Sequence, residues 1–238
     1  MTGLVEYTLP PGVRAFSTTR AFFAGEAVHP SRERCAQLLS QALGLPAVIA
    51  HQQHTDEVRC VEEPLLPNQL EGVDALMTNR RSLCLCVTTA DCIPLLLYDP
   101  QHQAIAAVHA GWRGTVLRIA QKAIAAMQAA YGTQPQSLHA VIGPGISLGN
   151  YEVGDEVHEA FAKAGFPMAA ISRKQERWHI DLPACNRLQL LESGVPSSNI
   201  ICTGICTFSN QDYYSYRREG PHTGRILTGI TLNPSLTL

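Results

Sequence analysis

The sequence has no large excess of charge of either sign. Its 18 lysines and arginines nearly balance 20 aspartates and glutamates, which gives a formal net charge of -2. The basic residues are scattered, whereas proteins that bind nucleic acid usually gather them in a patch or stripe. The composition therefore argues against nucleic acid as a partner and favours small molecules or other proteins.

Long hydrophobic runs are also missing. The apolar run "IPLLLY", residues 93–98, is far shorter than the roughly 18 residues of a membrane-spanning helix. The opening "MTGLVEYTLPPGVR" lacks the basic start and apolar stretch of a secretory signal. We therefore expect a cytoplasmic protein with no membrane partner, present as a monomer or a homodimer.

The eight cysteines include no pair with the C-x-x-C spacing of a zinc knuckle or a redox motif. Cys84 and Cys86 follow strand spacing, and Cys202 and Cys206 are four residues apart. Thiols stay reduced in the cytosol. We therefore expect most of these cysteines to be small core residues rather than disulfide partners.

The chain shows no internal repeat, low-complexity tract or linker, and we predict a single catalytic domain over residues 1–238. Its central part contains four strand-like runs in quick succession: "VDALMT", "LCLCVTT", "PLLLYD" and "AIAAVH". Gaps this short are too small for crossover helices between parallel strands. The pairing should therefore be antiparallel or mixed.

Helical patterns surround these strands. The sequence predicts helices within residues 33–44, 115–132, 153–165 and 182–194, and closing strands within 199–208 and 225–232. Thr115 is expected to cap the second of these helices, and Gly132 to end it. Helices and runs of consecutive strands together predict an α+β layered sandwich.

Three reactive groups flank the apolar runs in the middle of the chain. Asp91 and Cys92 precede "IPLLLY", and His109 follows "AIAAV". Cys92 and His109 are compatible with a nucleophile and its base, with two ligands of one metal, or with packing. Pro94 suits the start of a strand, which leaves Asp91 and Cys92 at the strand mouth.

A metal site needs a third donor, and "HQQHTD", residues 51–56, offers His51 and His54. His54, Cys92 and His109 would provide two imidazoles and one thiolate and leave the fourth tetrahedral position for water, as in catalytic zinc sites. The spacing of these residues matches no compact zinc-ligand signature. The residues by themselves leave the metal site and the cysteine nucleophile both open.

Two segments could bind an anion. The stretch "HAGWRG" predicts a strand, a glycine turn and a helix, whose free N–H groups and Arg113 would favour phosphate or carboxylate. The segment "YYSYRREGPHTGR", residues 213–225, combines tyrosines and arginines. It could hold a planar base and a phosphate, or it could be a solvated strand with packed tyrosines.

The motifs "QQHTDEV", "DALMT", "TADCIPLLLYD", "AVHAGWRGT", "IGPGIS" and "YYSYRREGPHTGR" occur together and in this order. In this respect the chain, from about residue 13 to residue 232, resembles the YfiH/YlmD family. Its members are also labelled multicopper polyphenol oxidases or laccase-domain proteins. The resemblance implies a layered α/β/β/α sandwich with mixed sheets, similar to cysteine hydrolases related to a bacterial cytotoxin.

The resemblance also implies a function. The metal ligands of the family correspond to His54, Cys92 and His109 of this chain, and the resemblance implies zinc as the cofactor, with copper possible in vitro. Its activity is phosphorolysis of purine nucleosides (adenosine, inosine and methylthioadenosine), together with adenosine deamination, so the partners are a purine nucleoside and phosphate. We expect Asp91, Cys92 and His109 to be catalytic. The residues expected to bind substrate or phosphate are Gln52, Arg113, Tyr216, Arg217 and Arg218.

Two features bear on this assignment. None of the nine histidines is followed by another two positions later, and a multicopper oxidase needs several such pairs to hold its copper cluster, so copper-dependent polyphenol oxidation is disfavoured. The segment after Arg20, residues 21–35, is shorter than in the family and lacks its asparagine. His51 lies outside the family pattern. Amide hydrolysis by Cys92 and His109 remains the main alternative.

Overall fold

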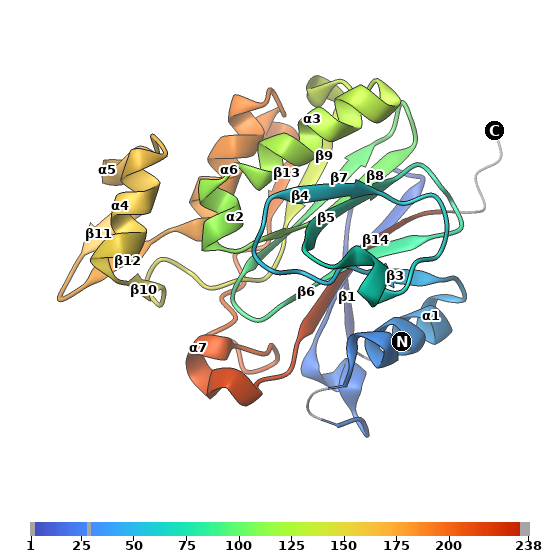
Figure 1. Ribbon diagram of the computed structural model, residues 1–238, viewed down its shortest axis with the longest axis horizontal. Coiled ribbons are helices and arrows are strands. Elements are labelled where there is room, and N and C mark those ends of the chain that lie inside the picture. Colours follow the sequence, from blue (N-terminus) through green and yellow to red (C-terminus); the bar gives the residue numbers. More distant parts are fainter. Residues whose placement is uncertain (1–2, 28–29, 234–238) are drawn as a thin grey trace.

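Two β-sheets lie face to face in the computed structural model, which describes residues 3–27 and 30–233 (Figure 1). The first sheet has the strand order β1 (Leu4–Tyr7), β2 (Val13–Thr18), β14 (Ile226–Leu232), β6 (Cys84–Thr89), β3 (Ala47–Ile49). The second has the order β13 (Ile200–Cys202), β9 (His139–Ile142), β7 (Ile93–Asp99), β8 (Ala104–Ala110), β5 (Val73–Thr78), β4 (Glu57–Cys60).

Both sheets are mixed, as the short gaps between strands predicted. In the six-stranded sheet β7 pairs antiparallel with β8 and β9, whereas β4 and β13 pair parallel with their neighbours. Pro94 is the second residue of β7, which lies inside the sheet. The strand therefore starts where the proline predicted, and its first residues follow Asp91 and Cys92 directly.

The alternation of side chains along β7 explains the layers. Leu95 and Leu97 pack on the helix side of the six-stranded sheet, with Ile124 of α3 (Ile119–Tyr131) in the same core cluster. Leu96 and Tyr98 point the other way and pack between the two sheets. Because successive side chains of a strand face opposite sides, a fully apolar strand of this kind must be covered on both faces.

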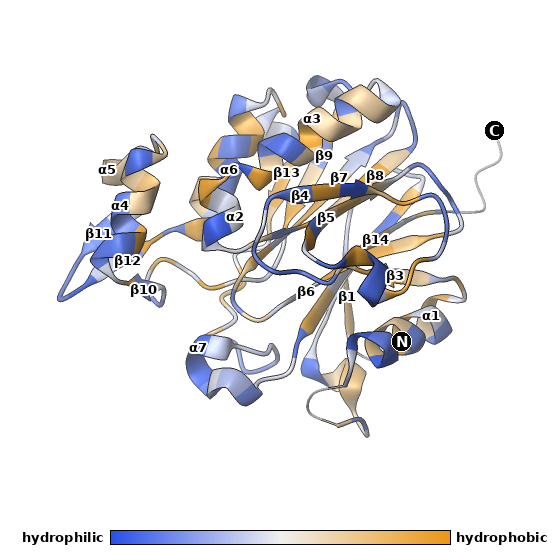
Figure 2. Ribbon diagram, in the orientation of Figure 1, coloured by the Kyte–Doolittle hydropathy of each residue, from blue (hydrophilic) through white to orange (hydrophobic). Residues whose placement is uncertain are grey.

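The five-stranded sheet repeats this pattern. Leu85 and Val87 of β6 pack between the sheets, and Cys84 and Cys86 face outward with Leu39 of α1 (Arg32–Leu43). Helix, sheet, sheet and helix thus follow one another, which confirms the expected layered α/β/β/α sandwich. Figure 2 shows hydrophobic residues along the strands of both sheets and hydrophilic residues on α4 (Asp155–Lys163) and α7 (Tyr216–Glu219).

The remaining elements lie on the α3 side. A three-stranded sheet has the order β10 (Glu152–Val153), β12 (Trp178–Ile180), β11 (Ser172–Lys174). In the chain, helix α5 (Met168–Ile171) directly precedes β11, and helix α6 (Leu182–Glu192) follows β12. In the part of the chain that the structure describes, no helix is long and apolar enough to cross a membrane.

The single helix predicted for residues 115–132 is wrong at its start. Helix α2 (Trp112–Val116) begins before it, and α3 follows after a break at Arg118, which has the left-handed φ of 64°. The Arg118 side chain donates to the Ala164 carbonyl at 2.8 Å, so tertiary contacts hold the break. Thr115 is buried inside α2 and caps nothing, whereas Gly132 ends α3 as predicted.

The closing strand predicted for residues 199–208 is shorter than expected. Only β13 forms there, and Gly204 then takes a φ of 67°, which an extended strand does not allow. Cys206 returns to the sheet at a single bridge with Gly145. The chain leaves the sheet between these points, and residues 203–205 line a surface cavity.

The cysteines divide into two groups. Four are buried, as predicted for core residues: Cys35, Cys84, Cys86 and Cys185. Cys60 and Cys202 are exposed, and Cys92 and Cys206 are partly exposed, so half of the cysteines, rather than most of them, are core residues. Burial would raise the pKa of the Cys206 thiol, but hydrogen bonds from the Ser147 hydroxyl and N–H and from Ser209 lower it to about 7.

Cys202 and Cys206 should differ in the pH at which they are alkylated, because their pKa values shift in opposite directions. The reaction of Cys206 with iodoacetamide should reach half its maximal rate near pH 7, because only the thiolate reacts. Cys202 should need a higher pH, because burial raises its pKa. Fragment-ion mass spectrometry after short exposures between pH 5 and 11 locates the label on each cysteine and measures both midpoints in one sample. Coincident midpoints would contradict the hydrogen-bond argument.

Candidate metal centre

Four neighbouring strands of the six-stranded sheet bring the reactive residues together in the order of the strands. Cys92 precedes β7, His109 lies on β8, Asp74 lies on β5, and His54 lies in the loop before β4. Register fixes their alignment: Pro94 pairs with His109, two residues after Cys92. Residues up to 55 positions apart in the chain, His54 and His109, therefore meet at one end of the sheet.

His54, Cys92 and His109 form a group of metal-donor atoms that all lie within 4.8 Å of one another. The Cys92 Sγ lies 3.7 Å from His54 Nε2, and the two imidazole rings meet edge to face with centroids 4.9 Å apart. Donors around a tetrahedral zinc ion lie about 3.5 Å apart, given its usual bond lengths. The set could therefore hold a single tetrahedral metal ion, with one position left for another ligand.

Asp74 holds both histidines in place and is itself fully buried. Its Oδ1 lies 2.6 Å from His109 Nδ1 and also accepts the His54 backbone N–H at 3.0 Å. Its Oδ2 accepts the N–H groups of Gln53 and Thr55 at 3.0 and 2.9 Å. A histidine that binds a metal commonly donates its other nitrogen to a carboxylate, so Asp74 leaves His109 Nε2 directed at the donor group.

A bulge lets Asp74 reach this position. Glu57 of β4 pairs with Val73, and the next residue, Val58, pairs with Ala75, so the pairing skips Asp74. A bulge of this kind turns the side chain of the extra residue away from its regular direction. Asp74 thereby reaches the loop that carries His54.

Two backbone features adapt the loops to the donor group. His54 has the left-handed φ of 61°, which a non-glycine residue adopts at a cost of about 1 kcal/mol. Its N–H bond to Asp74 stabilises this conformation. Gly111 leaves room for the imidazole: a Cβ at this position would lie 2.6 Å from His54 Cδ2 and 3.2 Å from Cys92 Sγ.

The electrostatics favour a thiolate at Cys92. Burial alone would raise the pKa of this thiol, but the charge and hydrogen bonding of His109, together with His54, lower it to about 6. Burial would lower the pKa of His109, yet Cys92 and Asp74 raise it to about 9. A thiolate is the form in which cysteine binds a metal or attacks as a nucleophile.

A cavity of about 510 Å³ opens over this group. Most of the residues predicted from the sequence line it: Gln52, His54, Asp91, Cys92, His109, Arg113, Tyr216 and Arg217. Its wall also contains Arg225, from the segment 213–225 that the sequence offered for a base and a phosphate. The remaining residues of the wall were not singled out from the sequence: Arg32, Thr88, Thr89, Ala90, Ile146 and Tyr151. The volume lies within the range usual for small-molecule sites.

Asp91, which directly precedes Cys92, connects this metal donor to α7. Its Oδ1 accepts the Thr207 hydroxyl at 2.6 Å, and its Oδ2 accepts the Arg217 N–H at 2.6 Å. Both oxygens thus have partners, and the residue has a φ of 88°. These contacts set the position of Arg217 relative to Cys92.

Arg113 and Arg217 both reach the cavity. The Arg113 guanidinium lies over the Trp112 ring, with 4.3 Å from Cζ to the ring centroid. The Arg217 Nη2 donates to the Glu152 carbonyl at 2.8 Å, and its Cζ lies 5.6 Å from the Tyr151 ring centroid. Ring and carbonyl contacts orient the guanidiniums without neutralising them.

The side chains of Gln52 and Arg218 are both hydrogen-bonded to the protein backbone. The Gln52 amide bonds the Thr88 backbone twice, at 2.7 and 2.8 Å. Arg218 is not part of the described cavity lining: its Nη1 donates to the Thr207 and Phe208 carbonyls at 2.6 and 2.7 Å. Gln52 joins the His54 loop to β6, and Arg218 holds the loop before α7.

Asp74 is the main functional residue that the sequence reasoning missed. The signal available was a single acid inside the otherwise apolar run "VDALMT". Buried carboxylates are rare unless they are paired. His51, which lies outside the family pattern, is not part of the donor group. Its backbone forms an isolated parallel β-bridge with Glu71.

Two curated proteins share much of this sequence. The chain is 51% identical over 168 residues to a purine nucleoside phosphorylase of Bacteroides thetaiotaomicron, a match that covers 69% of this chain and only 62% of that protein. It is 38% identical over 246 residues to adenosine deaminase RL5 of an unknown prokaryotic organism, covering 92% and 94% of the two chains.

The fold has a close counterpart among solved structures. The crystal structure of the hypothetical protein YfiH of Bacillus licheniformis has a TM-score of 0.86 at 25% identity, over 98% of this chain and 97% of that one. The family model described as multi-copper polyphenol oxidoreductase laccase matches residues 24–233. The chain therefore belongs to this laccase-domain family, as the resemblance of its motifs indicated.

Proposed function

We propose that the protein is a zinc-dependent purine nucleoside enzyme. It cleaves adenosine, inosine and methylthioadenosine by phosphorolysis and also deaminates adenosine. The names of the two relatives support the substrate class. The single observation that carries the proposal is the position of the donor group: His54, Cys92 and His109 share one cavity with the guanidiniums of Arg113 and Arg217.

Zinc is the metal that this donor set fits best, because two imidazoles and a thiolate with an open fourth position are typical of catalytic zinc. When bound, zinc would supply a Lewis acid beside the substrate. Copper also binds nitrogen and sulfur ligands tightly and could occupy the site in vitro. A multicopper centre needs further clusters, and the described residues contain only this one group of three donors.

In phosphorolysis the bond between the sugar C1′ and the purine N9 breaks, a C1′–O bond to phosphate forms, and the base leaves with a proton. Arg113 and Arg217 would hold the phosphate, since a guanidinium matches its oxygens in a fork. Tyr151, Tyr216 and Ile146 offer flat or apolar surface for the purine. In deamination, water replaces the amino group at C6 and ammonia leaves.

Asp91 remains our candidate for the acid or base. Its oxygens already accept hydrogen bonds from Thr207 and Arg217, which also makes it a positioning residue for Arg217. A proton transfer would use the remaining lone pairs of the same carboxylate.

The alternative is an amide hydrolase in which Cys92 attacks, His109 acts as base and Asp74 orients the imidazole. The same contacts would serve that chemistry. His54 separates the two proposals: its Nε2 lies 3.7 Å from Cys92 Sγ. A nucleophile–base–orienter triad needs no second imidazole at the sulfur, whereas a metal site needs a third donor.

Removal of the Asp74 charge should weaken the metal site. In Asp74→Asn the amide cannot accept from all its present donors, and we expect metal affinity to fall about ten- to a hundredfold. Loss of a buried pair should also lower the free energy of unfolding by about 3 kcal/mol. Elemental analysis and competition with a chelating dye measure the metal, and thermal unfolding measures stability.

Asp99→Asn is the matched control. Asp99 is also fully buried, and its Oδ2 lies 2.8 Å from His102 Nδ1, but it lies outside the cavity. Asp99→Asn should lose stability and keep about one metal per chain. Equal metal loss in both variants would mean that destabilisation alone empties the site.

Gly111→Ala tests the fit of the His54 ring. The added methyl group would displace the imidazole, so the variant should fold but bind metal much more weakly. Gly149→Ala is the control, because nothing lies within 4 Å of the added carbon there. Metal content and the circular dichroism spectrum are the two measurements. A Gly111→Ala protein with full metal occupancy would show that His54 is not a ligand.

The activity itself is tested with adenosine in the presence and absence of phosphate. Phosphorolysis predicts adenine release only with phosphate, and deamination predicts inosine without it. Arg113→Gln should raise the KM for phosphate about tenfold, the value of one lost charge-assisted contact, whereas the exposed Arg173→Gln should not. Chromatography separates the products. A zinc-loaded protein that is inert toward nucleosides but cleaves amides would favour the hydrolase.

A further inference from the structure

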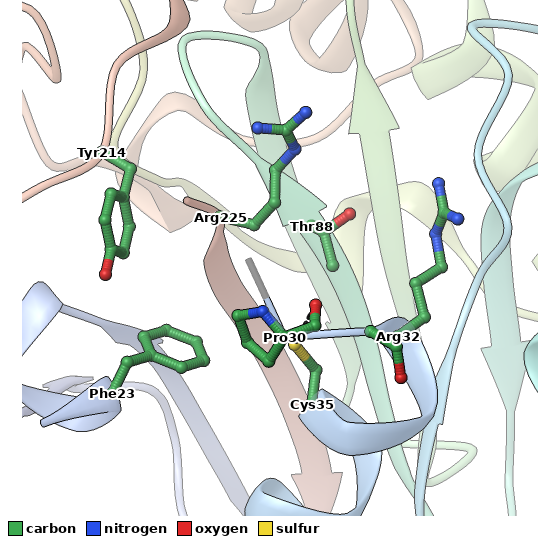
Figure 3. Close-up of a pocket in the computed structure, with 8 residues that line it drawn as sticks. Phe23, Pro30, Arg32, Cys35, Thr88, Tyr214 and Arg225 are labelled. Atoms are coloured by element: carbon green, nitrogen blue, oxygen red, sulfur yellow. Dashed lines mark hydrogen bonds between the residues drawn. The ribbon is translucent and has the colours of Figure 1, made fainter. Parts of the chain in front are cut away.

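A second cavity of about 220 Å³ adjoins the metal cavity. Three residues line both of them: Arg32, Thr88 and Arg225. The rest of the second lining is mainly apolar and consists of Phe23, Pro30, Ser31, Cys35 and Tyr214 (Figure 3). None of the three metal donors belongs to it. The shared residues therefore mark the end of the metal cavity that borders the second one.

The metal cavity carries more positive charge than the proposed reaction requires. Four guanidiniums line it, from Arg32, Arg113, Arg217 and Arg225, against the single carboxylate of Asp91. Arg113 and Arg217 account for one phosphate. Asp91 is already bound by Thr207 and Arg217, so it does not neutralise the other two arginines.

Arg32 and Arg225 keep their charge available. Within the residues that the structure describes, the Arg32 guanidinium has no hydrogen bond or ion pair. The Arg225 Nη1 donates to the Thr223 and Gly224 carbonyls at 2.9 and 3.0 Å, which orients the group without neutralising it. Figure 3 shows both side chains extending in the same direction on either side of Thr88, away from Phe23 and Cys35.

The wall of the metal cavity also contains a polar group without a partner. Thr89 lines the metal cavity and is only 2% exposed, yet its hydroxyl has no hydrogen-bond partner among the described residues. A buried hydroxyl without a partner costs about 1–3 kcal/mol. A polar ligand in the metal cavity that reached this hydroxyl would remove the cost.

We propose that Arg32 and Arg225 form a second anion subsite, which binds the 5′-phosphate of a nucleoside 5′-monophosphate. Two guanidiniums suit a phosphate dianion. The inference rests on the proposed function, because it assumes that the metal cavity takes a nucleoside. The attacking phosphate must lie at C1′, beside Arg113 and Arg217. An anion held at the other end of the cavity belongs to the substrate itself.

The reaction then gives a sugar bisphosphate. The C1′–N9 bond of the monophosphate breaks, an oxygen of inorganic phosphate bonds to C1′, and the purine leaves with a proton. The 5′-phosphate stays on the sugar, and no oxidant or reductant is needed.

The test is calorimetric binding of AMP and adenosine to the zinc-loaded protein without inorganic phosphate. AMP should bind at least about tenfold more tightly than adenosine, the value of one to two charge-assisted hydrogen bonds. Arg32→Gln and Arg225→Gln should each reduce this ratio at least about fivefold. The exposed Arg173→Gln removes the same charge from β11 and should leave the ratio unchanged. Arg32→Gln removes no hydrogen bond of the fold, so it guards against misfolding of Arg225→Gln.

Two outcomes would overturn the inference. AMP binding no tighter than adenosine would show that no second anion subsite exists. An Arg32→Gln variant with a raised KM for inorganic phosphate and an unchanged AMP to adenosine ratio would assign the pair to the attacking phosphate. Phosphate-dependent adenosine cleavage with either outcome would leave the proposed function standing. Tight, Arg32-dependent AMP binding by a protein that cleaves no nucleoside would support the anion subsite and contradict the proposed phosphorolysis.

Discussion

The hydrogen bond between Asp74 and His109 is the contact on which the rest of the site depends. One buried carboxylate fixes the His109 ring, accepts the backbone N–H groups of Gln53, His54 and Thr55, and stabilises the left-handed conformation of His54. Its pKa lies below the usual value, because these bonds outweigh burial, which alone would raise it. The charge therefore persists at neutral pH, and with it the alignment of both imidazoles.

This alignment is built into the sheet rather than into a flexible loop. The order β7, β8, β5, β4 sets Cys92, His109, Asp74 and His54 side by side, and apolar layers on both faces hold these strands in register. A site supported in this way is preorganised, since its ligands need little movement to bind a metal. The guanidiniums come instead from α1, α2 and the segments around α7 and before β14, which surround the end of the sheet.

Local patterns predicted much of this structure. Apolar alternation and short gaps gave the mixed sheets, and the motifs gave His54, Cys92 and His109, which the fold brings together as a possible donor group. Contacts between distant segments were not predictable in the same way. Three features depend on partners up to 46 residues away: the bulge at Asp74, the helix break at Arg118, and the hydrogen bonds from Arg218 to backbone carbonyls. Periodicity carries no information about such partners.

The family description and the donor set differ in what they require of the metal. Multicopper oxidation needs several copper ions within electron-transfer reach, held by paired histidines, and this chain offers one group of three donors in its described part. One metal cannot accumulate the electrons that reduce dioxygen to water. A Lewis acid needs only one ion, and the surrounding guanidiniums would hold the negatively charged phosphate that accepts the sugar in the proposed reaction. The charges around the cavity thus suit the proposed group transfer to an anion.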